Sequence, residues 1–388
     1  MNRCGRQSQR DVARRLYDVR LVATPTRLSD FSNELLDSTL KWSWACRALR
    51  TDGSVPAALL LPERSKPRRG DAALVHVDKV GHHHHVESDR ERRLRLYRGD
   101  RLICVFGERY ATDVYEGLIA GVEHLHLLTG SGVIGTVALR NHKVGRPTAL
   151  SFLGYLADPS GRRINLIERL FQPIRVPVAA DVEVIVVVGT AMNSGKTTVV
   201  RKMLRALVAA KLPVAACKLT GTASSRDLRE MRATGAAFTT DFNDYGFPST
   251  YGASLDELVL LFDHMRKACN EKGGHVVVME IADGCLQRET QMLLTSDDFR
   301  RRVRGVIVAG ACSSSTLYAV DCVQGAGLDV WAVSGRLTSS PLFVREFASR
   351  SPIPVLSSCF NDDWASLIMT KLVAAPHYPW AAAAEVTK

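Results

Sequence analysis

The sequence predicts an α/β protein with a mainly parallel sheet flanked by helices and preceded by a smaller β-rich domain. After residue 179, short β-branched runs alternate with segments of helical spacing, as in folds built on parallel sheets. Between about 71 and 173, short alternating runs are separated by glycines, as the strands of a β-rich domain would be. We therefore expect an N-terminal extension, a β-rich domain, an α/β domain and a tail, over residues 1–70, 71–175, 180–375 and 376–388.

The composition is that of a globular protein. A chain of 388 residues is too long for one typical domain, and 46 % hydrophobic residues suffice for buried cores. Much of the formal net charge of +11 lies in the first hundred residues, where arginines are interleaved with acids. This pattern favours a solvated face or a surface for anionic ligands over nucleic-acid binding.

The cysteines and the absence of long apolar runs bear on where in the cell the protein is expected. The nine cysteines form no CxxC pair and several lie in apolar runs, which predicts reduced, buried thiols. No stretch reaches about eighteen apolar residues, and the N-terminus has no apolar signal core. We therefore expect a cytoplasmic protein without a membrane partner.

The first seventy residues carry the weakest signals. Arg10 to Tyr17 and Ser32 to Leu49 have helical spacing, and Pro56, Pro62 and Pro67 mark a linker. This basic extension is either helical or partly disordered, and the sequence does not decide between the two.

The β-rich region contains two stretches that could be considered as ligand-binding sites. Strands are expected over Ala73–Val80, Arg93–Tyr97 and Arg101–Phe106. The glycine-dense stretch Leu127–Gly135 could admit a ligand backbone, but a tight turn between strands is the favoured interpretation. The four histidines His82–His85 could not all face one ion from a strand, and no cysteine or carboxylate lies at ligand spacing. They therefore predict an exposed loop.

The clearest motif lies at the start of the α/β domain. Val184 to Val188 is a β-branched run ended by Gly189, and Gly195-Lys196-Thr197-Thr198 opens a segment of helical spacing. Strand, loop, Gly-Lys-Thr and helix is the context that a phosphate-binding P-loop requires. Lys196 would reach the β- and γ-phosphates, and the Thr197 hydroxyl would bind Mg²⁺. The predicted phosphate-binding residues are Gly189, Thr190, Asn193, Ser194, Gly195, Lys196, Thr197 and Thr198.

The spacing of this loop departs from the common pattern. Five residues separate Gly189 from Gly195, where four are usual. Counting from Thr190 restores four, so the loop is a Thr-initiated variant.

Further strands and helices are expected downstream of the loop. The predicted strands are 213–220, 275–281, 303–309, 328–333 and 353–356, and the predicted helices are 226–234 and 255–269, with a loop over 241–251. Interleaved strands and helices place ligands at the strand carboxyl ends.

Two acids and a lysine follow these strands. Glu280 comes after three valines and a methionine, so it should be buried, which is costly unless it is paired or bound to metal. A Mg²⁺ or phosphate role is favoured for Glu280 and Asp283 over capping of the turn. Lys218 ends a neighbouring strand and binds substrate or phosphate, or lies at the surface. Asp241 and Asp244 lie in a loop that could reach the site, and their role stays open.

These motifs resemble dethiobiotin synthetase, of the P-loop NTPase class that includes signal-recognition GTPases and MinD ATPases. The resemblance rests on Gly-Thr-x4-Gly-Lys-Thr after a strand, a lysine ending the next strand and a glutamate near the end of the third. The residues that make up these motifs are more similar still to those of an uncharacterised bacterial group that resembles molybdopterin-guanine dinucleotide biosynthesis protein B. It also resembles a family of unknown function that is itself like dethiobiotin synthetase. The match covers about residues 180 to 360.

The resemblance implies further site residues and also has limits. The stretch 309–317 looks like the family's substrate-side loop, and 333–341 like its adenine-side loop, which implies nucleotide contacts from Ser334, Gly335 and Arg336. Dethiobiotin synthetase has a Glu-Gly-Ala-Gly-Gly turn where this chain has Glu280-Ile-Ala-Asp-Gly284, and it needs no β-rich domain. ATP binding carries over; biotin chemistry does not.

The sequence thus predicts an ATP- and Mg²⁺-dependent enzyme that activates a small-molecule acceptor by phosphoryl transfer, with ligase or kinase chemistry. Lys196, Lys218, Glu280 and Asp283 are the expected catalytic residues, with Thr197 and Glu280 on the metal. One alternative is a nucleotide-dependent switch or accessory protein in cofactor biosynthesis, and another is a transferase that binds a phosphorylated cofactor. The preference for ATP over GTP rests on the resemblance, although no Asn-Lys-x-Asp guanine motif is visible. The acceptor is unnamed, and a homodimer stays open.

Overall fold

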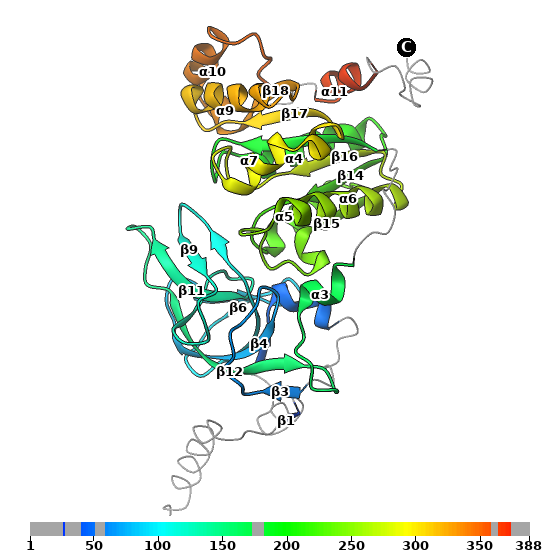
Figure 1. Cartoon of the computed structure of the whole chain (residues 1–388). Helices are drawn as coiled ribbons and strands as arrows, with labels where there is room; N and C mark the ends of the chain where they lie inside the picture. Colours follow the sequence, from blue (N-terminus) through cyan, green and yellow to red (C-terminus); the bar gives the residue numbers. More distant parts are fainter. Residues whose placement is uncertain (1–25, 28–39, 51–58, 173–181, 358–363, 374–388) are drawn as a thin grey trace, which may run out of the picture. The chain divides into compact units, whose positions relative to one another are not determined.

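The computed structural model describes residues 26–27, 40–50, 59–172, 182–357 and 364–373 (Figure 1). By their contacts, these residues form two compact units. The first comprises residues up to Glu108 together with Glu116–Leu170, and the second comprises Arg109–Tyr115 together with Phe171 onward. The predicted boundary between 175 and 180 lies outside the described residues.

The first unit is built on an extensive β-sheet. The strands of this sheet are β1 (Thr26–Arg27), β2 (Leu40–Trp42), β3 (Leu59–Leu61), β4 (Ala72–Lys79), β7 (Arg101–Phe106), β8 (Arg109–Tyr110), β9 (Tyr115–Leu118), β10 (Leu125–Leu127), β11 (Val133–Arg140) and β12 (Thr148–Ala157). All of them belong to the first unit except β8 and the first residue of β9, which the contacts assign to the second. Strands β5 (His85–Glu87) and β6 (Arg93–Arg95) form a separate hairpin. The pairings β12–β4–β7–β11 continue through β10, which pairs with both β11 and β12, so these five strands close into a barrel.

Alternating side chains of these strands fill the barrel. Val75, Val77, Leu102 and Cys104 are among the buried residues of one apolar cluster. The predicted strands coincide with β4, β6 and β7. The residues between β10 and β11 form the tight turn expected of the glycine-dense stretch, and the two strands pair in antiparallel register.

The N-terminal extension differs from its prediction where the structure describes it. Leu40–Trp42 is strand β2 and Trp44–Leu49 is the 3-10 helix η2, so the helical spacing over 32–49 does not correspond to an α-helix at this end. Strand β2 pairs with β7, and Trp42 is buried, so tertiary pairing overrides the local helical spacing. The segment Arg10–Tyr17 lies outside the described residues.

The second unit is an α/β layer structure. Its parallel sheet has the order β15–β14–β16–β13–β17–β18. The strands are β13 (Glu183–Gly189), β14 (Val214–Lys218), β15 (Phe238–Asp241), β16 (Val276–Glu280), β17 (Val303–Ala309) and β18 (Val330–Ser334). The helices are α4 (Lys196–Ala209), α5 (Ser225–Arg232), α6 (Leu255–Glu271), α7 (Arg288–Thr295), α8 (Asp297–Arg300), α9 (Ser313–Gly325), α10 (Pro341–Ala348) and α11 (Trp364–Val373), with 3-10 helices η3 (Phe242–Tyr245) and η4 (Gly335–Ser339).

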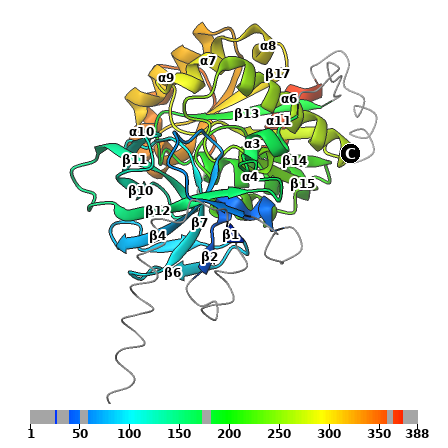
Figure 2. The same cartoon turned by 60° about the horizontal axis from the view of Figure 1, so that its bottom comes forward.

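Helices lie on either side of this sheet (Figure 2). Helices α4, α5 and α11 share one apolar cluster with strand residues that include Ile185, Val278 and Ile307. The alternate residues of the same strands, such as Val186 and Val277, are also fully buried. Strands buried on both faces are typical of parallel sheets, which confirms the predicted fold class.

Two predictions for this sheet need correction. Strand β15 lies where no strand is predicted, and its last residue, Asp241, is the first residue of the predicted loop over 241–251. The strand predicted over 353–356 is absent; Val355 forms only an isolated bridge with Val333. Pro352 and Pro354 lack the N–H group that a regular ladder needs, which limits the pairing to one point.

The histidine run and the membrane prediction can be compared with the described residues. His82–His84 precede β5, as expected of a loop, and His85 is the first residue of that strand. No cluster of three or more His, Cys, Asp or Glu in the described parts of the chain has metal-site geometry. Among the described helices, none combines the length and apolar character needed to cross a bilayer.

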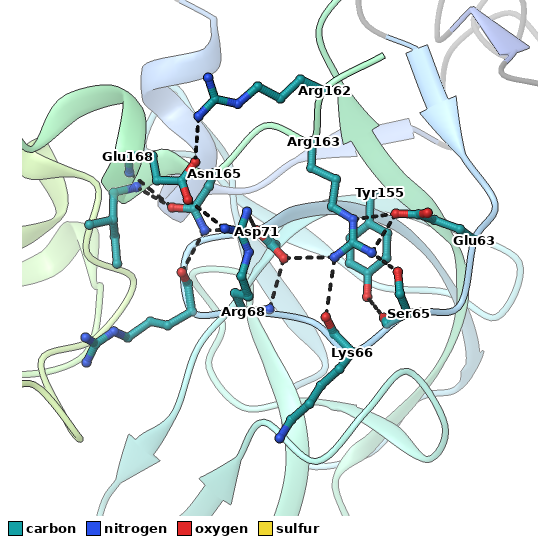
Figure 3. Close-up of polar contacts among 12 residues, drawn as sticks. Glu63, Ser65, Lys66, Arg68, Asp71, Tyr155, Arg162, Arg163, Asn165 and Glu168 are labelled. Carbon is teal, nitrogen blue, oxygen red and sulfur yellow. Dashed lines mark hydrogen bonds and ion pairs between the residues drawn. The ribbon is translucent and has the colours of Figure 1, made fainter.

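A buried carboxylate organises one end of the first unit. Asp71 is fully buried and accepts hydrogen bonds from the Arg68 backbone N–H (2.9 Å) and the Asn165 side-chain amide (2.8 Å). The Arg163 guanidinium lies 3.4 Å from Asp71 and stacks on the Tyr155 ring at 3.9 Å (Figure 3). This network joins the chain before β4 to the end of β12 and the start of α3 (Leu166–Leu170).

We expect Asp71→Ala to destabilise the first unit by about 1–3 kcal/mol, because the Arg68 backbone N–H and the Asn165 amide each lose a buried acceptor, although Arg163 keeps its pair with Glu63. Hydrogen–deuterium exchange of peptides within residues 59–172, measured along a urea series, reports this loss. The control is Arg162→Ala, whose side chain is 73 % exposed and which should stay within about 0.5 kcal/mol of wild type. Equal protection in the two variants would contradict the role of Asp71.

Candidate functional site: a P-loop with facing carboxylates

The predicted phosphate loop connects β13 to α4. Its backbone is left-handed at Asn193 (φ 57°) and at Gly195 (φ 100°), the residue that precedes the helix. A Cβ on Gly195 would also lie 3.1 Å from Cα of Gly335, so this position requires glycine on two grounds. The turn thereby brings the chain sharply from the end of the strand into the helix.

The loop exposes a row of donors. Among the described residues, no acceptor is present for the backbone N–H groups of Ala191, Met192, Asn193, Ser194 or Gly195. The helix that follows adds the positive end of its dipole. Consecutive unpaired N–H groups at a helix N-terminus form a binding site for an anion such as phosphate.

A second loop lies against this one. The Arg336 backbone N–H donates to the Ser194 carbonyl (2.9 Å), and a Cβ on Gly335 would meet that carbonyl at 2.4 Å. The hydroxyls of Ser194 and Ser334 are buried without a hydrogen-bond partner. The stretch that the resemblance assigns to the adenine side thus contacts the phosphate loop, while the Arg336 side chain is exposed.

Lys196 is buried at the first turn of α4. Its ammonium donates to the carbonyls of Ala191 (2.9 Å) and Asp283 (2.5 Å). Burial lowers the pKa of Lys196, and the charges of Glu280 and Asp283 oppose this shift. The ammonium is therefore held beside the loop, within the site that it is expected to serve.

Thr197 and Glu280 meet across the sheet edge, as the sequence predicts. The Thr197 hydroxyl lies 3.4 Å from Glu280 Oε1, while the buried Glu280 Oε2 has no partner. Burial raises the pKa of Glu280, and Lys218 opposes the shift. A hydroxyl beside one carboxylate with an unused oxygen fits Mg²⁺, which is held by few protein ligands together with phosphate oxygens and waters.

Lys218 joins the same group of charges. It ends β14 directly beside Glu280 in the sheet register, and its ammonium lies 3.7 Å from Glu280 Oε1. The ammonium also donates to Asp227 of α5. Burial alone would lower the pKa of Lys218, but the carboxylates of Asp227 and Glu280 outweigh it and the pKa is raised. Lys218 is therefore a fixed cation.

Asp227 was not identified from the sequence. It lies in the first turn of a predicted helix, where an acid is ordinarily explained by the helix dipole. Burial would raise its pKa, but the Lys218 ammonium lowers it overall. An acid nine residues after a strand-ending lysine is the only signal that could have identified it.

Asp283 completes the cluster from the loop after β16. Its backbone is left-handed (φ 59°), which is uncommon for a residue other than glycine. Burial raises the pKa of its carboxyl, against the charges of Lys196, Lys218 and Arg109. Arg109 is a second residue that sequence reasoning missed.

Other candidates have structural roles or lie apart. The Asp241 carboxylate accepts from the backbone N–H groups of Asn243 and Asp244, and Asp244 accepts from Thr240 and from the Asp241 backbone. These bonds form a capping box on η3. The Thr198 side chain is exposed. The Thr190 hydroxyl accepts from the backbone of Ala311 (3.2 Å), which links the phosphate loop to the stretch 309–317.

The motif, the loop geometry and the sheet order are those of a P-loop NTPase. No protein-family model and no curated protein matches the sequence. Two similar solved structures are of the signal recognition particle receptor FtsY from Elizabethkingia anophelis, one of them in complex with GDP. Both show 16 % identity over 49 % of this chain and 61 % of the FtsY chain, with TM-scores of 0.31 and 0.32. The match thus spans less than two thirds of FtsY, and it assigns no ligand or activity here.

Glu280 should cost stability in the ligand-free protein. Its raised pKa means that the folded state holds a proton to higher pH than the unfolded state does, so its contribution to stability declines as pH rises above the ordinary carboxyl range. We expect Glu280→Gln to be at least as stable as wild type at pH 7, with the difference vanishing at low pH. Thermal midpoints across pH 4–8 measure this.

The matched control is Asp227→Asn, for which the expected change in stability at pH 7 has the opposite sign. The lowered pKa of Asp227 means that this carboxylate adds stability above its ordinary pKa, and that the gain is lost as pH falls through the folded-state value. Asp227→Asn should therefore lower the midpoint at pH 7. A Glu280→Gln protein less stable than wild type at pH 7 would overturn this interpretation.

Proposed function

We propose that the second unit binds a nucleoside triphosphate with Mg²⁺ and transfers its γ-phosphoryl group to a small-molecule acceptor. One observation carries the proposal: five unpaired backbone N–H groups lie beside Lys196, and an unused Glu280 oxygen lies beside the Thr197 hydroxyl. The first group suits phosphate and the second suits a divalent cation. Both belong to one loop and the strand next to it.

Each residue has a distinct role in this proposal. The loop N–H groups hold the phosphates, and Lys196 turns from its two carbonyl partners to the β- and γ-phosphates. Thr197 and Glu280 would hold Mg²⁺, which neutralises charge that develops on the phosphate oxygens. Lys218 and Asp283 face the acceptor. Donors fixed before the reaction need no reorganisation when the charge develops.

ATP is the proposed nucleotide. The support is the resemblance of the two loops to those of dethiobiotin synthetase, together with the absence of an Asn-Lys-x-Asp motif from the sequence. The FtsY structure with GDP shows a guanine nucleotide in that protein. A direct comparison of ATP and GTP is therefore part of the test.

We expect Lys196→Ala to weaken binding of ATP with Mg²⁺ by about 100-fold or more, because a charge-assisted contact to phosphate is lost. Calorimetry with ATP and GTP, with and without Mg²⁺, measures this. Thr197→Ala should bind ATP in the absence of Mg²⁺ as wild type does and lose the gain that Mg²⁺ confers. Lys202→Ala, on the same helix, serves as control. Equal affinity of Lys196→Ala and wild type for ATP with Mg²⁺ would contradict the proposal.

The transfer step needs its own test. Lys218 is a fixed cation next to Glu280, which suits an anionic acceptor such as a carboxylate. A screen of small carboxylic acids should find one that stimulates ATP hydrolysis, and Lys218→Met should lose the stimulation while still binding ATP. ATP-dependent dimerisation without any stimulating acceptor would favour a nucleotide-dependent switch instead.

A further inference from the structure

The hairpin of β5 and β6 in the first unit presents a basic surface to solvent. Val86 and Leu96 belong to the buried apolar cluster of this unit. Because side chains alternate along an extended chain, Arg93, Arg95 and Tyr97 lie on the opposite face, and all three are exposed. They follow one another at intervals of about 7 Å, so an extended ligand could contact them in succession.

A second basic segment lies beside this hairpin. The Leu96 N–H donates to the His84 carbonyl (3.0 Å), which joins the histidine run to the hairpin. The His82 N–H donates to the Arg146 carbonyl (2.8 Å), and a Cβ on Gly81 would lie 2.3 Å from the same carbonyl oxygen. The histidine run is therefore in close contact with the loop between β11 and β12. Residues 137–147, which include this loop, contain three cations and no acid.

The cations of the two segments form one surface, which we call the basic face. All of its eight lysine and arginine side chains are exposed: Arg90, Arg92, Arg93, Arg95, Arg98, Arg140, Lys143 and Arg146. Residues 82–98 contain three acids, of which Asp89 pairs with Arg50, outside the two segments. Within the described parts of the chain, none of the eight cations pairs with a carboxylate. In sequence the arginines alternate with acids, but the fold places them next to a loop that has none.

Aromatic rings lie among these cations. Tyr97 is 63 % exposed, and its ring lies 5.7 Å from the Lys41 ammonium. The rings of His84 and His85 are 4.5 Å apart. Burial, together with the charges of the neighbouring arginines, lowers the pKa of His85, so this ring is neutral at pH 7. Exposed rings next to cations are the combination on which unpaired bases stack.

We propose that the basic face binds single-stranded nucleic acid, with its arginines on the phosphates and the Tyr97 ring stacked on a base. Arginine supplies seven of the eight cations, and its planar guanidinium can donate two parallel hydrogen bonds to one phosphate. Several such contacts release counterions from the nucleic acid, which favours binding. This inference is independent of the nucleotide site proposed for the second unit.

A single strand fits this surface better than a duplex or an acidic peptide does. The described helices of the first unit, η2 and α3, have six and five residues, too few to read a major groove as a recognition helix does. Bases that are not paired can instead stack on a ring that a β-hairpin presents. An acidic peptide would pair with the arginines but would make no use of the Tyr97 ring.

Fluorescence anisotropy with a labelled single strand of about 16 nucleotides tests the role of the arginines. The oligonucleotide carries a 5′-hydroxyl, so that no terminal phosphate can enter the phosphate loop. We expect Arg93→Ala/Arg95→Ala to weaken binding at least about tenfold and to reduce the slope of log affinity against log salt by about 1.4, or about 0.7 for each lost phosphate contact. The matched control, Arg205→Ala/Arg229→Ala, removes two exposed arginines of α4 and α5 and should bind as wild type does.

Tyr97 tests whether bases are stacked. We expect Tyr97→Ala to weaken binding of the single strand by about tenfold with an unchanged salt slope, because stacking involves no charge. Tyr97→Phe keeps the ring and should bind as wild type does. A duplex of the same sequence should bind more weakly and should not respond to Tyr97→Ala.

The outcomes separate this inference from its alternatives. Equal affinity of the Arg93→Ala/Arg95→Ala protein and its control would overturn it. Wild-type affinity in Tyr97→Ala would also overturn it and would indicate a partner recognised by charge alone, such as polyphosphate or an acidic peptide. Lys196→Ala should bind the oligonucleotide as wild type does; loss of binding there would place the oligonucleotide on the phosphate loop instead. Thermal midpoints of all variants exclude loss of folding as the cause.

Discussion

The parallel register of three neighbouring strands is the constraint on which the site depends. Glu280 pairs with Val187 on one side and with Lys218 on the other, so the carboxyl ends of β13, β14 and β16 coincide. The phosphate loop, the acid and the lysine therefore converge without a long loop. The same register buries Glu280 inside an apolar sheet, which leaves one of its oxygens without a partner. A bound cation would remove that cost, so the site is least stable when it is empty.

Cations and carboxylates are mixed in this site. Lys196, Lys218 and Arg109 lie among Glu280, Asp283 and Asp227, and each acid affects the pKa of at least one of these cations. The balance is local and carries strain, since Asn193 and Asp283 both have left-handed backbones. A site built this way favours an incoming anion and metal together, because either one alone would leave the other charges uncompensated.

Sequence reasoning succeeded where a residue is fixed by its own strand. Lys218, Glu280 and Thr197 each lie at the end of a β-branched run or at the start of a helix, so local pattern placed them in one crevice. Asp227 and Arg109 were missed because their positions follow from tertiary packing and not from a local pattern. Strand β15 and the isolated bridge at Val355 were misjudged for a related reason: pairing with a neighbour, and the prolines that limit it, decide short edge segments.

The cluster also bears on which acceptors the proposed phosphoryl transfer could use. A hydroxyl acceptor must lose a proton, whereas a carboxylate acceptor arrives without one to lose. Lys218 cannot take that proton, because its pKa is raised and it is already charged. Burial raises the pKa of the Asp283 carboxyl, which would make it a stronger base than an exposed carboxylate. A hydroxyl acceptor would therefore depend on Asp283 as base, while a carboxylate acceptor would need only the positive charge of Lys218.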